Sequence, residues 1–300
     1  MSIGRDIMEF RTRIDIPESE WKIDTGAKVL LVGSCFADEV GQRMVAGGLK
    51  AMVNPFGTLY NPASIAASLL RSISEREYGE NAVELVRDNA DGVWHSWMHH
   101  SRFSSADRDA LLARMNGTMH EVADFLRCAD VLVVTLGTAM VYRLKETGML
   151  VANCHKQSDG MFDRSLLTAY DIADQWQMLL QLLASVNPRL KVVFTVSPIR
   201  HRRDGWHANQ VSKGVLLQAV DALVQTSAVQ ACSYFPAYEI MMDELRDYRF
   251  YAADMVHPSD VAVEYIWQRF QDTYFDNKTK DAVAKATKEG RRAQHRTIVK

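Results

Sequence analysis

The segment Lys28-Val-Leu-Leu-Val-Gly-Ser-Cys-Phe-Ala37 decides the fold of this chain. An apolar run leads into a glycine and a serine, and the residues that follow have the composition of a helix. A strand that turns tightly into a helix places the hydroxyl of Ser34 at the strand's carboxyl end. Open α/β sheets bind ligands at that edge, where the amides of a helix start also point. The segment predicts a functional hydroxyl at Ser34, although a serine here is also a common helix N-cap.

Short apolar runs along the chain predict a parallel sheet. They are rich in leucine and β-branched residues, as expected of strands that are buried on both faces. They alternate with segments of helical length, which is the pattern of right-handed βαβ units. The predicted strands are residues 29–32, 131–136 and 192–196, with two more near 231–235 and 52–54, and the predicted helices are 62–72, 106–128, 168–186, 208–227 and 258–275.

Two segments interrupt this alternation and predict β-hairpins. Residues 84–98 turn at Asp91-Gly92, and residues 141–152 form the second hairpin. Both would hang off the sheet and wall its pocket, because loops carry binding residues on a rigid scaffold. The tail, residues 276–300, is polar and basic without an apolar face, which predicts a loose helix or disorder.

An acid and an imidazole lie three residues apart near the end of the chain, at Asp254 and His257. A serine hydroxyl is a weak nucleophile until a base takes its proton, and a carboxylate that fixes the base's tautomer improves that base. The Asp-x-x-His spacing on a loop entering a helix lets both side chains reach one point, with Pro258 in the first helical turn. Ser34, His257 and Asp254 therefore form a candidate triad, while His257 alone also fits a polar helix start.

Six short blocks, in order over about residues 28 to 270, carry a resemblance to a known family. The blocks are Gly33-Ser-Cys-Phe-Ala37, Asn54-Pro-Phe-Gly-Thr-Leu-Tyr-Asn-Pro62, Leu136-Gly-Thr-Ala139, Val151-Ala-Asn-Cys-His-Lys156, Ser197-Pro-Ile-Arg-His201 and Asp254-Met-Val-His-Pro258. With them the chain resembles the GSCFA family, a branch of the SGNH (GDSL-like) hydrolases. The resemblance implies a three-layer α/β/α sandwich with a mainly parallel, flavodoxin-like sheet, decorated here by the hairpins. It also implies that Ser34 is the nucleophile, His257 the base and Asp254 its orienter.

The resemblance also implies an oxyanion hole, where this chain departs from the SGNH pattern. SGNH enzymes usually use the serine amide, here of Ser34, a glycine amide from a second block, here of Gly57, and an asparagine side chain from a third block. The third block carries Ala139 in place of that asparagine. Asn153 is the predicted substitute and Thr138 a weaker one; a missing donor typically lowers the rate about 10²- to 10³-fold.

Four further residues of these blocks are candidate substrate-binding residues: Asn54, His155, Arg200 and His201. Arg200 and His201 follow a predicted strand and so reach the same carboxyl edge, where they could bind an anionic or sugar group. A structural role in the loop is the alternative for both.

Composition agrees with a compact, enzyme-sized domain. The chain has 300 residues, of which 47% are hydrophobic and 24% charged, enough for one sizeable core. We predict one domain over residues 1–275, followed by the tail. The net charge is −2 and charges of both signs are interspersed, so neither nucleic acid nor a membrane is the expected partner. With neither a signal-like start nor a long apolar run, we expect a cytoplasmic protein; the sequence leaves a homo-oligomer open.

Cysteines and histidines offer alternative chemistry. Cys35, Cys128, Cys154 and Cys232 have no paired short spacing and are interpreted as reduced core residues, although a nucleophile at Cys35 or Cys154 is conceivable. The histidines at positions 95, 99 and 100 could hold a metal if the segment were helical, but the segment from Trp94 to His99 is better interpreted as a strand. We therefore expect no metal and no cofactor.

The sequence predicts a serine hydrolase that acts on an ester of a carbohydrate or small metabolite through a Ser34 acyl-enzyme. The short acyl group is inferred from the family resemblance alone. An acyltransferase that passes the acyl group to a sugar hydroxyl is one alternative. A non-catalytic binding module on the same fold is the other, and Ala139 favours it.

Overall fold

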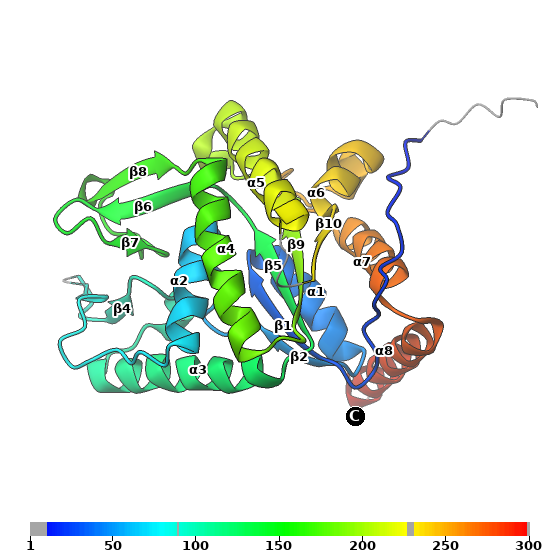
Figure 1. The fold of residues 1–300 in the computed structure, drawn as a ribbon, viewed down its shortest axis with the longest axis horizontal. Helices are drawn as coiled ribbons and strands as arrows, with labels where there is room; N and C mark the ends of the chain where they lie inside the picture. The colour runs from blue at the N-terminus through cyan, green and yellow to red at the C-terminus, as the bar shows by residue number, and fades with distance from the viewer. Residues whose placement is uncertain (1–10, 89, 227–230, 299–300) are drawn as a thin grey trace, which may run out of the picture.

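Five parallel strands form the central sheet in the computed structural model, which describes residues 11–88, 90–226 and 231–298 (Figure 1). Their order, β2-β1-β5-β9-β10, is the flavodoxin-like order of a doubly wound fold. Every pairing in this sheet is parallel, so the predicted α/β class is confirmed. The strands are β1 (Lys28–Gly33), β2 (Lys50–Val53), β5 (Val131–Leu136), β9 (Lys191–Val196) and β10 (Cys232–Phe235).

The register of the sheet brings three strand ends to one edge. Gly33 of β1 lies beside Thr135 of β5, and Thr135 lies beside Thr195 of β9. Because the strands are parallel and level, the residues that follow them emerge side by side. Ser34, after β1, and Ser197, after β9, therefore start loops at the carboxyl edge on either side of β5.

Two hydrophobic cores cover the two faces of the sheet. Side chains alternate along β1, so that Leu30 and Val32 enter one core while Val29 and Leu31 enter the other. The first core lies under α2 (Pro62–Ile73), α3 (Arg108–Cys128), α4 (Ala169–Val186) and α5 (Trp206–Thr226). The second lies under α1 (Cys35–Ala46) and α7 (Asp260–Tyr274). The predicted three-layer arrangement is confirmed (Figure 1).

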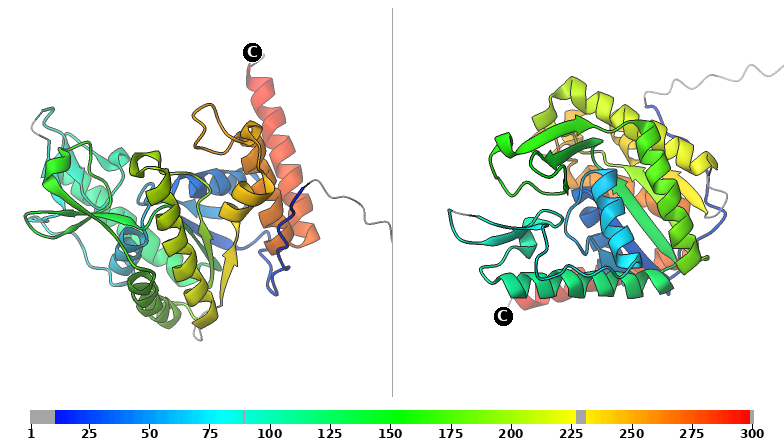
Figure 2. Two further views of the ribbon diagram at one scale, coloured as in Figure 1. Left: turned by 90° about the horizontal axis from the view of Figure 1, so that it is seen from above. Right: turned by 60° about the vertical axis from the view of Figure 1, so that its left-hand side comes forward.

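Both predicted hairpins are present and project from the same side of the molecule (Figure 2). The first pairs β3 (Leu85–Arg87) with β4 (Trp94–Ser96). The second pairs β6 (Met140–Leu144) with β7 (Leu150–Val151). A third strand, β8 (Phe162–Leu166), pairs with the other edge of β6, and the sequence analysis missed it because its pattern is mostly polar and exposed.

Short helical turns complete the described chain. They are η1 (Ser101–Phe103), η2 (Asp159–Met161), η3 (Arg202–Asp204), α6 (Ala237–Glu239), the π-helical η4 (Ile240–Glu244) and η5 (Tyr248–Phe250). The η4 turn carries Glu244, whose two carboxylate oxygens accept hydrogen bonds from the buried Arg269 of α7 at 3.0 and 2.7 Å.

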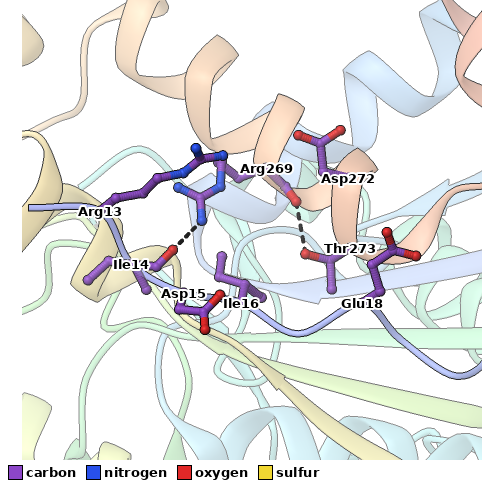
Figure 3. Close-up of a pocket in the computed structure, with 8 residues that line it drawn as sticks. All are labelled: Arg13, Ile14, Asp15, Ile16, Glu18, Arg269, Asp272 and Thr273. Carbon is purple, nitrogen blue, oxygen red and sulfur yellow. Dashed lines mark hydrogen bonds between the residues drawn. The ribbon is translucent and has the colours of Figure 1, made fainter. Parts of the chain in front are cut away.

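The segment from Arg11 to Glu18 runs along α7 and is fixed there by Arg269. The guanidinium of Arg269 also donates to the carbonyl of Ile14. These groups line a hollow of about 400 Å³ (Figure 3). The helical residues that line it lie in the C-terminal half of α7, whereas His257 precedes the first turn of that helix. The hollow is therefore separate from the candidate site.

The tail forms a helix, α8 (Asn277–Ile298), which was one of the two predicted states. The prediction that it lacks an apolar face is wrong, because Val283 is buried in the second core. The last two residues lie outside the described part of the chain. Among the described helices, α8 included, none combines the length and apolar character that a membrane span requires.

Candidate active site

Ser34 lies in the turn between β1 and α1, as predicted. It is 1% exposed, and its Oγ accepts a hydrogen bond from the amide of Phe36 at 3.3 Å, so that it caps α1. The preceding Gly33 has φ +134°, and a β-carbon there would lie 2.1 Å from the carbonyl oxygen of Thr135. Only glycine fits both conditions. Gly33 therefore allows the chain to turn at the strand end and present Ser34.

Asn54 holds this turn from the side. Its Oδ1 accepts a hydrogen bond from the amide of Gly33 at 2.8 Å, and its Nδ2 donates to the carbonyl of Ser34 at 3.5 Å. The side chain is 1% exposed and bonds only to backbone groups within the described chain. We predicted Asn54 as a substrate-binding residue; that role stays a prediction, and the contacts seen here hold the turn in place.

Asp254 and His257 form a tight carboxylate–imidazole pair. Asp254 Oδ2 lies 2.5 Å from His257 Nδ1, and its Oδ1 accepts the amides of His257 and Val256 at 3.0 and 2.9 Å. These hydrogen bonds, first the one from the His257 amide, lower the pKa of Asp254 to about 2. The carboxylate therefore stays charged at neutral pH. Pro258 precedes the helix instead of lying in its first turn, because Ser259 is the N-cap.

The pair and Ser34 belong to loops at one edge of the sheet, but they are not bonded to each other. The His257 side chain is 49% exposed. Within the described chain no hydrogen bond joins its ring to Ser34 Oγ, which caps α1 instead. Catalytic hydrogen bonds are often long before substrate binds. Ser34 Oγ only accepts in the cap, so its own proton stays available for donation to a base.

Three of the predicted oxyanion-hole donors have partners within the fold. The amide of Ser34 donates to Thr135 O at 3.0 Å, and the amide of Gly57 donates to Asn54 O at 2.7 Å. The hydroxyl of Thr138 lies 3.0 Å from that of Ser212. These three assignments remain predictions, but each group has a competing partner in this structure.

Asn153 has the contacts expected of its alternative role, capping a turn. Its Oδ1 accepts the amide of His155 at 2.9 Å, and its own amide donates to Trp97 O at 3.1 Å. Its Nδ2 has no hydrogen bond to the described residues, so the predicted donor role stays untested. Ala139 is buried in the first core, and its amide donates to Ser212 Oγ at 2.7 Å. A side chain at position 139 therefore faces the core.

Lys213 is a buried residue near this edge that the sequence analysis missed. It is 1% exposed, and its Nζ donates to Gly137 O and to Ser197 O, both at 2.7 Å. Burial, with a smaller contribution from Arg200, lowers the pKa of Lys213 to about 7. Helical spacing could have revealed it, because Lys213 falls on the face of α5 that also carries the buried Asn209 and Leu216.

His201 follows β9 and lies over the end of β5. A β-carbon on Gly137 would lie 3.1 Å from His201 Nε2. The ring meets that of Tyr60 edge to face, with centroids 5.4 Å apart and planes at 88°. Burial, with smaller contributions from the nearby Lys213 and His257, lowers the pKa of His201 to about 4. The predicted binding residue is thus a neutral imidazole at the carboxyl edge.

The other two predicted binding residues have structural contacts. Arg200 Nε donates to Asn209 Oδ1 at 2.6 Å, and its guanidinium lies 5.3 Å from the ring centre of Trp206. His155 Nε2 lies 2.7 Å from Ser96 O in the region of the hairpins, and its Nδ1 is buried without a partner. Neither assignment is tested by these contacts.

The three neighbouring histidines do not gather into one metal site in the described structure. His99 is buried against Ser96 Oγ at 2.8 Å, and His100 Nδ1 caps η1. The predicted strand ends at Ser96, so His95 and His99 do not share a strand face. Instead, ligand atoms of Asp88, Asp91 and His95 lie within 4.8 Å of one another.

The candidate thiol nucleophiles stay protonated at neutral pH. Burial, with a smaller contribution from Asp38, raises the pKa of Cys35 to about 11. Burial likewise raises the pKa of Cys154 to about 11. Because the thiolate is the reactive form, neither cysteine is an activated nucleophile in this structure.

Several known proteins are similar to the chain. A GDSL-like lipase from Parabacteroides merdae is 11% identical, with a TM-score of 0.43, covering 86% of this chain and 98% of that one. A carbohydrate esterase family 3 protein from Talaromyces cellulolyticus is 12% identical, with a TM-score of 0.37 and coverage of 81% and 94%. An acetyl xylan esterase from Butyrivibrio proteoclasticus is 10% identical, with a TM-score of 0.38 and coverage of 86% and 64%.

Sequence comparison identifies the family of the chain. No curated protein matches the chain. The model of the GSCFA family matches residues 28–270, which include all six blocks and both parts of the candidate triad. The chain therefore belongs to the GSCFA family.

Proposed function

We propose that the protein is an SGNH-type serine hydrolase that cleaves an ester through a Ser34 acyl-enzyme. The observation that carries the proposal is the Asp254–His257 pair. Its 2.5 Å contact and the low pKa of Asp254 give His257 a permanently charged orienting partner. A carboxylate in this place fixes the imidazole tautomer and stabilises the imidazolium that forms during the reaction.

In the proposed mechanism, Ser34 Oγ attacks the carbonyl carbon of the ester while its proton passes to Nε2 of His257. The carbonyl electron pair moves onto oxygen and gives a tetrahedral oxyanion. Collapse of this intermediate breaks the bond to the alcohol, which leaves with the proton from His257. Water then attacks the acyl-enzyme, His257 takes a proton from that water, and the proton returns to Ser34 Oγ as the acid leaves.

A short acyl group on a carbohydrate or small metabolite is the substrate class that we propose. Support comes from the family membership and from the rim near the site. Trp206 is 52% exposed at the start of α5 and lies against Arg200. An exposed aromatic face beside a fixed cation suits a polyhydroxylated ligand, because the ring supplies an apolar surface and the guanidinium supplies donors.

A non-catalytic binding module is the second candidate, and two observations favour it. Ser34 is almost fully buried and bonded to Phe36, and two of the predicted oxyanion donors, the amides of Ser34 and Gly57, have backbone partners. In this reading the same edge would bind a ligand without forming a covalent bond to Ser34.

Intact-mass measurement after exposure to a fluorophosphonate separates the two candidates. A hydrolase should gain one phosphonyl adduct on the wild type and none on Ser34→Ala. The His257→Ala variant should react far more slowly, because no base takes the Ser34 proton. A wild type that stays unmodified under conditions that label a control esterase would support the binding module.

A further inference from the structure

The proposed reaction needs a donor for the oxyanion, and the backbone candidates are engaged elsewhere. The amides of Ser34 and Gly57 donate within the fold, and so do those of Gly137 and Thr138, which both donate to Tyr60 O at 2.8 and 3.0 Å. A donor with no partner of its own could meet a developing charge without first breaking a hydrogen bond. At least part of the stabilisation of the oxyanion must therefore come from another group.

His201 lies where such a donor is needed. Because Gly33 is level with Thr135, Ser34 is level with Leu136, and Gly137 is the next residue along β5. The Nε2 atom of His201 is 3.1 Å from the place of a β-carbon on Gly137. The ring thus overhangs the strand end directly beside the turn that carries Ser34.

The chemical state of His201 suits the role. Neither ring nitrogen bonds to another residue of the described chain, so no partner fixes the tautomer and Nε2 can carry the proton. The groups that face the ring are Tyr60, Lys213 and His257, and burial keeps its pKa low, at about 4. At neutral pH the ring offers one N–H and no charge, like the neutral histidines that polarise carbonyl groups in other enzymes.

We propose that the Nε2–H of His201 donates a hydrogen bond to the oxyanion formed at Ser34, as the side-chain donor that the third block of this chain does not supply. The inference rests on the proposed hydrolase function. The donor stays protonated throughout, so the step adds no proton transfer to those already described. Asn153 is the competing side-chain donor, and its Oδ1 already accepts a hydrogen bond from the amide of His155.

The test compares two substitutions at position 201, with p-nitrophenyl acetate as the probe. His201→Phe keeps the ring shape and removes the donor, and it should lower kcat about 10²- to 10³-fold with KM changed little. His201→Gln restores a neutral N–H, and its kcat should be at least tenfold higher than that of His201→Phe. His120→Phe makes the same substitution at a partly exposed position of α3, outside the site, and is the matched control that should keep kcat.

A second readout separates a donor from a merely structural residue. A trifluoromethyl ketone forms a reversible adduct on Ser34 with an oxyanion, whereas the product carboxylate does not. His201→Phe should lower the affinity for the ketone by about the same factor as kcat and leave inhibition by the product carboxylate unchanged. Full kcat or unchanged ketone affinity in His201→Phe would overturn the inference for His201. If the wild type shows neither ester turnover nor fluorophosphonate labelling that depends on Ser34, the hydrolase proposal itself is overturned.

Discussion

Lys213→Met should flatten the rise of stability with pH that the buried lysine causes. An unfolded lysine has a pKa of 10.5, and burial lowers the pKa of Lys213 to about 7. Between these values the unfolded chain binds one more proton than the folded chain, so the free energy of unfolding rises with pH. The slope is about 1.4 kcal/mol per pH unit when fully developed. Allowing for partial titration near neutrality, the gain from about pH 7 to pH 9 is roughly 2 kcal/mol.

Methionine cannot titrate, and it also leaves Gly137 O and Ser197 O without their donor. The lost hydrogen bonds destabilise the variant by an amount that does not depend on pH. The gap, taken as the free energy of unfolding of the wild type minus that of Lys213→Met, should therefore rise by roughly 2 kcal/mol across the window. Urea unfolding followed by tryptophan fluorescence at several pH values measures the gap. The exposed Lys145→Met is the control, and its gap should stay constant. A gap for Lys213→Met that stays constant or narrows would refute the reasoning.

Three further predictions concern the candidate triad and Asn153, which competes with His201 as the oxyanion donor. Ser34→Ala or His257→Ala should lower ester turnover by about 10⁴-fold or more, and the double variant should lose little beyond that, because the residues act as one unit; fully additive losses in steady-state kinetics would contradict the assignment. Asp254→Asn keeps an oxygen for the two amides but sets an NH₂ against His257 Nδ1, so turnover should fall by about 10⁴-fold with the melting temperature little changed. Asn153→Ala should lower the melting temperature by a few degrees, since the His155 amide loses its acceptor, and leave kcat within about threefold; a drop in kcat of about 10²-fold would favour the donor role instead.

Much of the fold could be predicted from sequence because its signals are local. The apolar run before Gly33 and the run 131–136 are buried on both faces, so they lack the alternation of a one-sided strand. The strand β8 escaped prediction because its sequence, Phe-Asp-Arg-Ser-Leu, exposes four of its five side chains. It is defined by its pairing with β6, and such pairing leaves little trace in composition.

The candidate site was predictable in its residue types and less so in their partners. Asp254 and His257 are close in sequence, so the geometry of one loop fixes their contact. Ser34, Asn54 and Gly57 had plausible roles as reacting or binding groups. Which backbone groups they would bond to depends on where the loops after β1 and β2 meet, and the sequence contains no local signal for that.

The polar face at the start of α5 indicates how this edge of the sheet is completed. Apolar side chains at Asn209, Ser212 and Lys213 would avoid the cost of burying polar atoms. Yet Gly137 O and Ser197 O follow the last residues of β5 and β9, where the strand ladders can no longer pair them. Lys213 donates to both carbonyls, and Ser212 accepts the amide of Ala139. Lys213 and Ser212 thus satisfy backbone groups where the strands end, and the adjoining loops can hold polar groups such as His201 at the edge without leaving these backbone groups unpaired.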